Sequence, residues 1–176
     1  GGTLMDEENT LTSDWGEYSP ATKVAVFNYE VKLENAKFVL TSDTLRYSTD
    51  SKIANIVGPS NIDSEENHIY SELGFYNTQS GQAELLNRSV LTNEGKSLTG
   101  DSLFYDRNKG YGEAFRHIEF IDTINKNRLT GNYCYYNQLT SYAIATDRAV
   151  ATDFSQGDSL FIHADTLQLF TYFLNT

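Results

Sequence analysis

The chain has 176 residues, 39% of them hydrophobic, which is enough for one domain with a core. Its formal net charge of −11 comes from 13 Lys plus Arg against 24 Asp plus Glu, without a basic cluster, and this argues against nucleic-acid binding. The 12 Tyr and 10 Phe, against one Trp and two Pro, favour strands over helices, so the sequence predicts an all-β fold.

The first ten residues, GGTLMDEENT, are glycine-led and acidic. We expect residues 1–10 to form a tail, in part a remnant of expression, and residues 11–176 to form a single repeat domain. A start of this kind would leave any secretion signal outside the chain. No run of about 18 apolar residues occurs, so we expect no membrane-spanning helix.

From residue 11 onward, a phrase of eight residues recurs. It reads LTSDWGEY from Leu11, LTSDTLRY from Leu40, IYSELGFY from Ile69, LTGDSLFY from Leu98, LTGNYCYY from Leu129 and IHADTLQL from Ile162. The starts lie 29, 29, 29, 31 and 33 residues apart, so about six units fill the domain. Position one is always Leu or Ile, position three is small, position four is acidic or Asn, and position eight is Tyr in every copy but the last.

Each copy predicts a strand followed by a polar turn and a second strand, as in LTSDTLRY, STDSK and IANIV. Positions four, six and eight share one face of the first strand. Position one is also apolar but has the opposite parity, so either both faces are partly buried or a bulge lies near position three. The connectors between units grow by two residues at a time, which keeps each side chain of a strand on its own face.

The second strand of the unit repeats as well. It carries a column of small residues and a column of apolar residues, namely Ala25, Ala54, Ala83, Gly112 and Ala143, and Leu33, Ile62, Leu91, Phe120 and Ala151. A unit of this size cannot bury its apolar face alone, so neighbouring units must stack to make a core. The sequence therefore predicts an elongated β-jellyroll or β-solenoid-like roll of about six repeats of 29–33 residues with open ends.

The acid at position four is the most regular polar feature. It is Asp14, Asp43, Glu72, Asp101 and Asp165, with Asn132 in the fifth copy. A calcium ladder is one interpretation, but calcium-binding β-rolls have glycine-rich repeats of about nine residues. We therefore expect no metal site, and we expect the acids to bond amides at turns and strand ends or to face water.

No pattern of catalytic residues is found. His68, His117 and His163 lie in different columns of the repeat, and no nucleophile elbow, zinc-protease or nucleotide-binding motif occurs. The single cysteine, Cys134, lies in a strand-like context and is expected to be a buried apolar residue. We expect no enzymatic activity and no cofactor.

The repeat L-T-S/G-D-x-L-x-Y, followed by a turn, an Ala- or Gly-rich strand and a G-x-x-x-I element such as GPSNI, resembles the OstA-like family. That family is related to LptA, LptC and the periplasmic domain of LptD. The resemblance covers the chain from Leu11 to Leu169. It implies a periplasmic β-jellyroll with a hydrophobic interior that carries lipopolysaccharide acyl chains between membranes by joining like domains end to end.

The expected function is therefore non-enzymatic binding of lipopolysaccharide or lipid A, in the periplasm and in association with the outer membrane. The residues expected to line an apolar groove are Leu33, Leu45, Tyr47, Ile62, Tyr76, Leu91, Leu103, Tyr105 and Phe120. Exposed strand edges, such as the tail LFTYFLNT from Leu169 to Thr176, are expected to join the chain head to tail to itself or to a related domain.

Two alternatives remain open. The first is a structural or adhesive β-solenoid in which the same columns pack as a closed core, which is how repeat proteins ordinarily use them. The second is a polysaccharide-active β-helix, which would gather acids from several repeats in a surface cleft.

Overall fold

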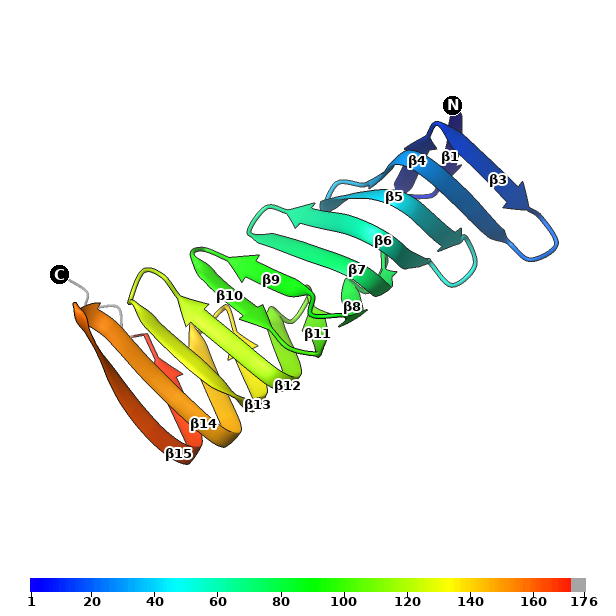
Figure 1. Cartoon of the computed structure of the whole chain (residues 1–176). Helices are drawn as coiled ribbons and strands as arrows, with labels where there is room; N and C mark the ends of the chain where they lie inside the picture. Colours follow the sequence, from blue (N-terminus) through cyan, green and yellow to red (C-terminus); the bar gives the residue numbers. More distant parts are fainter. Residues whose placement is uncertain (172–176) are drawn as a thin grey trace.

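A computed structural model describes residues 1–171 of the protein as one sheet of 15 antiparallel strands, with no helix in that range. The strands are β1 (Gly2–Asp6), β2 (Asn9–Ser13), β3 (Trp15–Ser19), β4 (Val24–Glu34), β5 (Phe38–Ser48), β6 (Ile53–Ser64), β7 (Asn67–Asn77), β8 (Gln82–Leu86), β9 (Val90–Asn93), β10 (Lys96–Thr99), β11 (Ser102–Asp106), β12 (Tyr111–Asp122), β13 (Asn127–Asn137), β14 (Tyr142–Gln156) and β15 (Asp158–Phe170). Figure 1 shows an elongated roll in which β1 and β15 lie at opposite ends. The prediction of an elongated all-β roll is confirmed.

Each long strand bends near its middle, because the pairing register shifts there by a bulge. The small residue at position three of the phrase forms the bend. The Ser42 hydroxyl donates to the Thr44 carbonyl oxygen at 2.8 Å, and the Ser60 hydroxyl on the next strand donates to the Ser42 hydroxyl at 2.7 Å. The bulge accounts for the opposite parity of positions one and eight, so the sheet folds over and turns both apolar sets inward.

The bends divide the sheet into two layers that face each other across an interior. The tyrosine layer contains residues 15–19, 24–28, 44–48, 53–57, 73–77, 82–86, 102–106, 111–115, 133–137, 142–146 and 166–170. The leucine layer contains residues 2–6, 9–13, 31–34, 38–42, 60–64, 67–71, 90–93, 96–99, 118–122, 127–131, 149–153 and 158–164. Bends join the layers along one long edge. Along the other edge, which we call the seam, the hairpin ends of the two layers meet.

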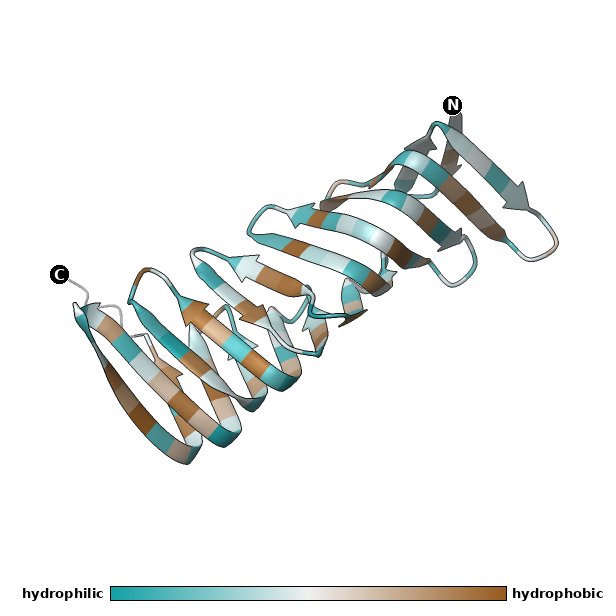
Figure 2. Ribbon diagram, in the orientation of Figure 1, coloured by the Kyte–Doolittle hydropathy of each residue, from teal (hydrophilic) through white to brown (hydrophobic). Residues whose placement is uncertain are grey.

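The leucine layer presents one uninterrupted row of cross-strand neighbours to the interior. This leucine row is Leu4, Leu11, Leu33, Leu40, Ile62, Ile69, Leu91, Leu98, Phe120, Leu129, Ala151 and Ile162. The residues that alternate with it along each strand face outward by the two-residue period and are mostly polar. Figure 2 shows hydrophilic and hydrophobic bands along the strands. The row contains position one of every repeat, which explains why that position is always Leu or Ile.

The tyrosine layer presents two rows. The tyrosine row is Tyr18, Ala25, Tyr47, Ala54, Tyr76, Ala83, Tyr105, Gly112, Tyr136, Ala143 and Leu169. The middle row is Gly16, Phe27, Leu45, Ile56, Gly74, Leu85, Leu103, Ala114, Cys134, Ala145 and Leu167. Each interior tyrosine lies between two small residues, Ala or Gly, on the neighbouring strands. Because these residues are small, there is space for the tyrosine ring.

Residues 1–10 differ from their expected role as a tail. Residues 2–6 form β1, which pairs with β2 in register, so that Leu4 lies opposite Leu11 and packs against the core. This short strand contains no copy of the repeated phrase, because it forms only a leucine-layer half-strand. The repeat pattern therefore gives no sign of it.

The acids at position four point away from the interior at the bends, where most of them are exposed. Asp101 is only partly exposed, and it accepts hydrogen bonds from His117 Nδ1 at 2.8 Å and from Arg88 Nη1 at 3.2 Å. Glu72 accepts a hydrogen bond from the Tyr70 hydroxyl at 2.7 Å. The hydrogen bond from His117 is the main reason why the pKa of Asp101 is lowered. These acids therefore belong to the outer surface of the bends, which is compatible with the expectation that they face water.

Candidate functional site: the interior and its seam

All nine residues predicted to line a groove lie inside the roll. Their side chains are at most 3% exposed: Leu33, Leu45, Tyr47, Ile62, Tyr76, Leu91, Leu103, Tyr105 and Phe120. Four belong to the leucine row, two to the middle row and three to the tyrosine row. The fold therefore brings the whole predicted set together in one apolar interior. Contact of these residues with lipid stays a prediction.

The interior of this structure is filled by the protein's own side chains. Rings from the two layers meet across it: Phe120 packs on Tyr136 with centroids 5.0 Å apart, and Phe38 meets Tyr76 edge-on at 4.8 Å. Each such ring buries about 150–250 Å². An occupant of the interior would therefore have to part the two layers and replace these contacts with its own.

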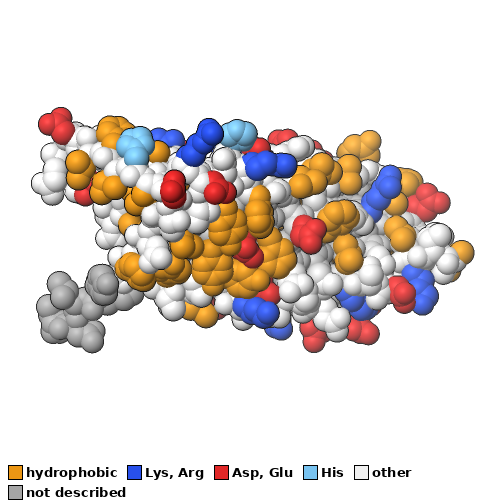
Figure 3. All heavy atoms as spheres, turned by 90° about the horizontal axis from the view of Figure 1, so that it is seen from below, with side chains coloured by type: hydrophobic (Ala, Val, Ile, Leu, Met, Phe, Trp, Pro, Cys, Tyr) orange, Lys and Arg blue, Asp and Glu red, His pale blue; other side chains and the backbone are white. Residues whose placement is uncertain are grey.

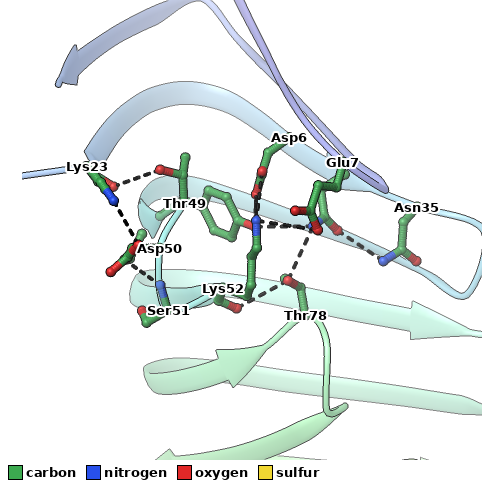
Figure 4. Close-up of polar contacts among 12 residues, drawn as sticks. Asp6, Glu7, Lys23, Asn35, Thr49, Asp50, Ser51, Lys52 and Thr78 are labelled. Atoms are coloured by element: carbon green, nitrogen blue, oxygen red, sulfur yellow. Dashed lines mark hydrogen bonds and ion pairs between the residues drawn. The ribbon is translucent and has the colours of Figure 1, made fainter.

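At the N-terminal end, a buried polar cluster closes the seam (Figure 4). The Tyr47 hydroxyl, from the tyrosine layer, donates to Asp6 Oδ2 at 2.8 Å and accepts from Asn9 Nδ2 at 3.1 Å, both in the leucine layer. Lys52 Nζ bonds both carboxylate oxygens of Asp6 at 2.8 Å, and the side chains of this ion pair are only about 15% exposed. The hydrogen bond to Asp6 raises the pKa of Lys52.

Further along the seam, the hydroxyls of two more interior tyrosines bridge the layers. Asn67 Nδ2 donates to the Tyr105 hydroxyl at 2.7 Å, and the Tyr136 hydroxyl donates to Asn93 Oδ1 at 3.2 Å. Burial raises the pKa of both phenols. Tyrosine hydroxyls and polar side chains of the leucine layer therefore hold the seam together at intervals along the roll.

Tyr76 makes a different contact at the seam. Its hydroxyl accepts from Arg107 Nη1 at 2.6 Å, and the Arg107 guanidinium lies 5.5 Å from the centre of the Phe38 ring in the leucine layer. Burial raises the pKa of Tyr76 to about 12, although the charge of Arg107 opposes that shift. Here a cation on an aromatic ring, in place of a hydroxyl bridge, connects the two layers.

A polar depression of about 340 Å³ lies beside these contacts, lined in part by Asn67, Arg107 and Gln138. Each of the three has a buried polar atom that finds no hydrogen-bond partner among residues 1–171: Asn67 Oδ1, Arg107 Nη2 and Gln138 Oε1. Buried polar atoms in proteins are nearly always paired with protein, water or ligand. The seam therefore has two acceptors and one donor with capacity for a polar group from outside.

The interior becomes accessible at the C-terminal end. Leu160 and Ile162 of β15 are 62% and 50% exposed, although Ile162 continues the leucine row. Within residues 1–171, no strand pairs with the outer side of β15. Of the predicted edge Leu169–Thr176, residues 169 and 170 lie in β15, whereas residues 172–176 lie outside the described part of the chain.

The asparagines of the seam are not among the residues predicted from the sequence. Asn9 and Asn67 stand two residues before a leucine-row residue, and Asn93 stands two residues after one. The two-residue period therefore places all three on the inner face at the end of a strand. A polar residue at that place in a strand is the available signal, and all three asparagines lie outside the copies of the eight-residue phrase.

Cys134 is buried in the middle row, as expected, and burial raises the pKa of its thiol to about 12. Because the thiolate is the reactive form, we expect the native protein not to react with Ellman's reagent at pH 8. One equivalent of thiol should react in guanidinium chloride, as measured by absorbance. Rapid reaction in buffer alone would contradict the tight packing of the middle row.

Comparisons with known proteins agree with this architecture. The family model described as OstA-like protein matches residues 1–43 and 67–153. One similar solved structure is LptH from Pseudomonas aeruginosa, described as the LptA-homologous periplasmic component of the conserved lipopolysaccharide transport device. It superposes with a TM-score of 0.59 and 17% sequence identity, over 64% of this chain and 93% of LptH.

None of the curated proteins searched matches the chain. Within residues 1–171, no helix is long and apolar enough to cross a membrane. The likeness to LptH supports the fold, and the family match covers most of the sequence. The chain is a member of the OstA-like protein family.

Proposed function

We propose that this OstA-like chain is a periplasmic module of lipopolysaccharide transport that holds acyl chains between its two layers. The observation that carries the proposal is the set of three interior rows, which run through the roll with only apolar residues, glycine and tyrosine. The family match and the description of LptH support the same assignment. Such a module requires no catalytic residue, because it acts by burying apolar surface.

The seam is the proposed entrance. At the bends, continuous backbone joins the layers, whereas at the seam they are joined by side chains such as Tyr105 and Asn67. A hydrogen bond of this kind contributes about 1 kcal/mol to stability. Burial of an acyl chain of about 12 methylenes yields on the order of 10 kcal/mol. A lipid can therefore offset the loss of several seam contacts and of part of the packing between the layers.

The polar part of the lipid would remain at the seam, where the unpartnered atoms of Asn67, Arg107 and Gln138 lie. Hydroxyl groups of a sugar can donate to the two amide oxygens, and an oxygen of the same headgroup can accept from the guanidinium. The phosphates would face solvent, because Glu65 and Glu66 line the same depression. This placement accommodates an anionic lipid on a protein of charge −11.

We also propose that the roll joins a second copy or a related domain head to tail, in the periplasm and in association with the outer membrane. The outer edge of β15, with which no strand within residues 1–171 pairs, presents exposed Leu160 and Phe161. Pairing of that edge with the β1 or β3 edge of another roll would continue the interior rows across the junction.

The tight packing of the interior favours a second candidate function, a structural or adhesive roll with a closed core. The two functions differ in whether the layers can part. Cross-linking the seam tests this directly. Cysteines at Glu66 and Gln138, which line the same depression, are joined with a short bismaleimide, and binding of a fluorescent lipid A analogue is measured before and after.

If lipid enters through the seam, we expect cross-linking to weaken binding at least about tenfold, because the layers can no longer separate. The matched control places cysteines at Ser80 and Asn108, which are hydrogen-bonded neighbours in two loops of the tyrosine layer alone. That cross-link should leave the affinity within about twofold. Absence of saturable lipid binding by the wild-type protein would exclude the transport proposal and leave the closed core.

A further inference from the structure

The outer face of the tyrosine layer carries a broad apolar patch near the middle of the roll. Its exposed members are Val57, Leu73, Phe75, Leu86 and Phe115, each 39% to 50% exposed. Figure 3 shows hydrophobic side chains gathered on one face of the roll, with acidic side chains beside them. These five residues belong to none of the three interior rows, and their side chains point away from the interior. A contiguous patch of this kind on a soluble protein commonly marks an interaction surface.

The patch is hollowed along the roll axis. Depressions of about 320, 380 and 530 Å³ adjoin one another, since the first two share Phe75, the last two share Glu84 and Phe104, and the first and last share Leu86. Together they form one groove that crosses the strands from β5 to β12. We call it the outer groove.

Two rows of cross-strand neighbours form the floor of the outer groove. One row is Val57, Leu73, Leu86, Ser102, Phe115 and Tyr133. The other is Phe75, Glu84, Phe104, Glu113 and Tyr135, in which aromatic and acidic residues alternate. The second row therefore sets two carboxylates, one on each side of Phe104, in an otherwise apolar floor.

In the described part of the chain, these two carboxylates have no cationic partner. Within residues 1–171, neither Glu84 nor Glu113 forms an ion pair, and Glu113 accepts a hydrogen bond only from the Tyr133 hydroxyl, at 2.6 Å. Carboxylates beside apolar surface gain most from a partner that brings both apolar groups and cations. Arg46 lies at the far end of the outer groove, so a basic residue marks one end and the two carboxylates lie toward the other.

The spacing of the carboxylates distinguishes a helix from a strand as the occupant. Glu84 and Glu113 are in register with Phe104 on either side of it, so they lie two strand spacings apart, about 9.6 Å. Residues seven apart on one face of an α-helix are separated by about 10.5 Å. In an extended segment, residues on one face lie about 6.8 or 13.6 Å apart, and neither value matches.

We propose that the outer groove binds an amphipathic helix of a partner protein, with Lys or Arg seven residues apart facing Glu84 and Glu113. Apolar side chains between the two cations lie on Phe104 and fill the depressions on both sides of it. A second copy of this chain fits less well, because the same concave, acidic face would meet itself and bury like charges.

The test uses two synthetic helical peptides of identical composition, both rich in Ala and Leu. In the first, two lysines spaced seven residues apart border the apolar face; in the second, the lysines lie on the opposite face. We expect the first peptide to bind the full chain at least about fivefold more tightly by fluorescence anisotropy, which corresponds to about 1 kcal/mol. Equal affinities would overturn the proposal, because binding would then reflect net charge alone.

Variants of the chain locate the peptide. Phe75→Ser with Phe104→Ser should weaken binding of the first peptide about tenfold or more, and Glu84→Gln with Glu113→Gln should remove the preference between the peptides. The matched control, Asp14→Asn with Asp43→Asn, removes the same charge at exposed bends and should change affinity by less than about twofold.

Unchanged binding by the Phe75→Ser, Phe104→Ser variant would overturn the assignment to the outer groove. All of these substitutions lie on the surface, and circular dichroism verifies that each variant is folded. Analytical ultracentrifugation of the wild-type chain measures independently whether it self-associates. Self-association that the same two serines abolish would make a second copy the occupant and would overturn the helix proposal.

Discussion

Replacing Gly74 with alanine is expected to lower the free energy of unfolding by about 3 to 5 kcal/mol. A Cβ atom at this position in β7 would lie 2.3 Å from the carbonyl oxygen of Glu84 and 2.9 Å from the Cα of Leu85. The backbone also has a φ of +152°, which residues other than glycine rarely adopt. Strained φ and overpacking each contribute about 1 to 3 kcal/mol. Urea denaturation followed by circular dichroism measures the loss.

Gly58→Ala is the matched control. Gly58 also has a positive φ, +118°, but nothing lies within 4 Å of an added Cβ. It therefore experiences the backbone strain without the clash, and we expect a loss of only about 1 to 3 kcal/mol. Equal losses at the two positions would show that the contact between β7 and β8 is looser than the structure indicates.

The second large effect is a loss of stability at alkaline pH. Burial, above all, raises the pKa of Tyr47 and of Tyr76 from 10.0 to about 12. A raised folded pKa means that the folded state holds its proton more tightly, so this stability is fully present below pH 10 and disappears as the pH rises through 12. A shift of this size corresponds to roughly 3 kcal/mol for Tyr76, and to less for Tyr47, whose hydroxyl at the seam is partly screened by solvent. We expect the free energy of unfolding to fall steeply between pH 10 and 12.

Urea denaturation at a series of pH values, with tyrosinate absorbance recorded in parallel, measures this effect. The double variant Tyr47→Phe, Tyr76→Phe should be less stable at pH 7, because Asn9 and Arg107 lose partners, but its stability should depend less on pH above 10. Tyr29→Phe is the control, because Tyr29 is 68% exposed. A folded protein in which every tyrosine titrates near pH 10 would contradict the buried tyrosine row.

Much of the fold could be predicted from the sequence because the interior repeats. Leu40, Leu45 and Tyr47 recur at fixed positions, and the structure places each kind in its own row. A bulge was one of two interpretations of why positions one and eight of the phrase are both apolar yet differ in parity. The bulge depends on side-chain hydrogen bonds, such as that from the Ser42 hydroxyl to the Thr44 carbonyl oxygen, and a pattern of apolar residues does not specify them. The half-strand β1 was missed because a strand confined to one layer carries no bend and therefore no copy of the phrase.

The candidate site was predicted in part. The residues of the interior were identified, because apolar residues that recur with the period of a strand mark its buried face. Whether the interior is filled depends on the distance between the layers, which is set by side chains such as Phe120 and Tyr136 meeting from different repeats. The seam depends on pairs such as Asn67 and Tyr105, which are 38 residues apart, and a single sequence contains no signal for such a pairing.

The alternation of Tyr with Ala or Gly along the tyrosine row also restricts how this architecture can change its length. Removal of one strand would place two tyrosines on neighbouring strands, where each ring needs the space that Ala54 or Ala83 now leaves. Removal of a hairpin of two strands keeps the alternation along the tyrosine row. Rolls of this kind should therefore grow and shrink in evolution by whole hairpins, and the repeat of about 29 residues is the smallest insertion or deletion that leaves the interior unchanged.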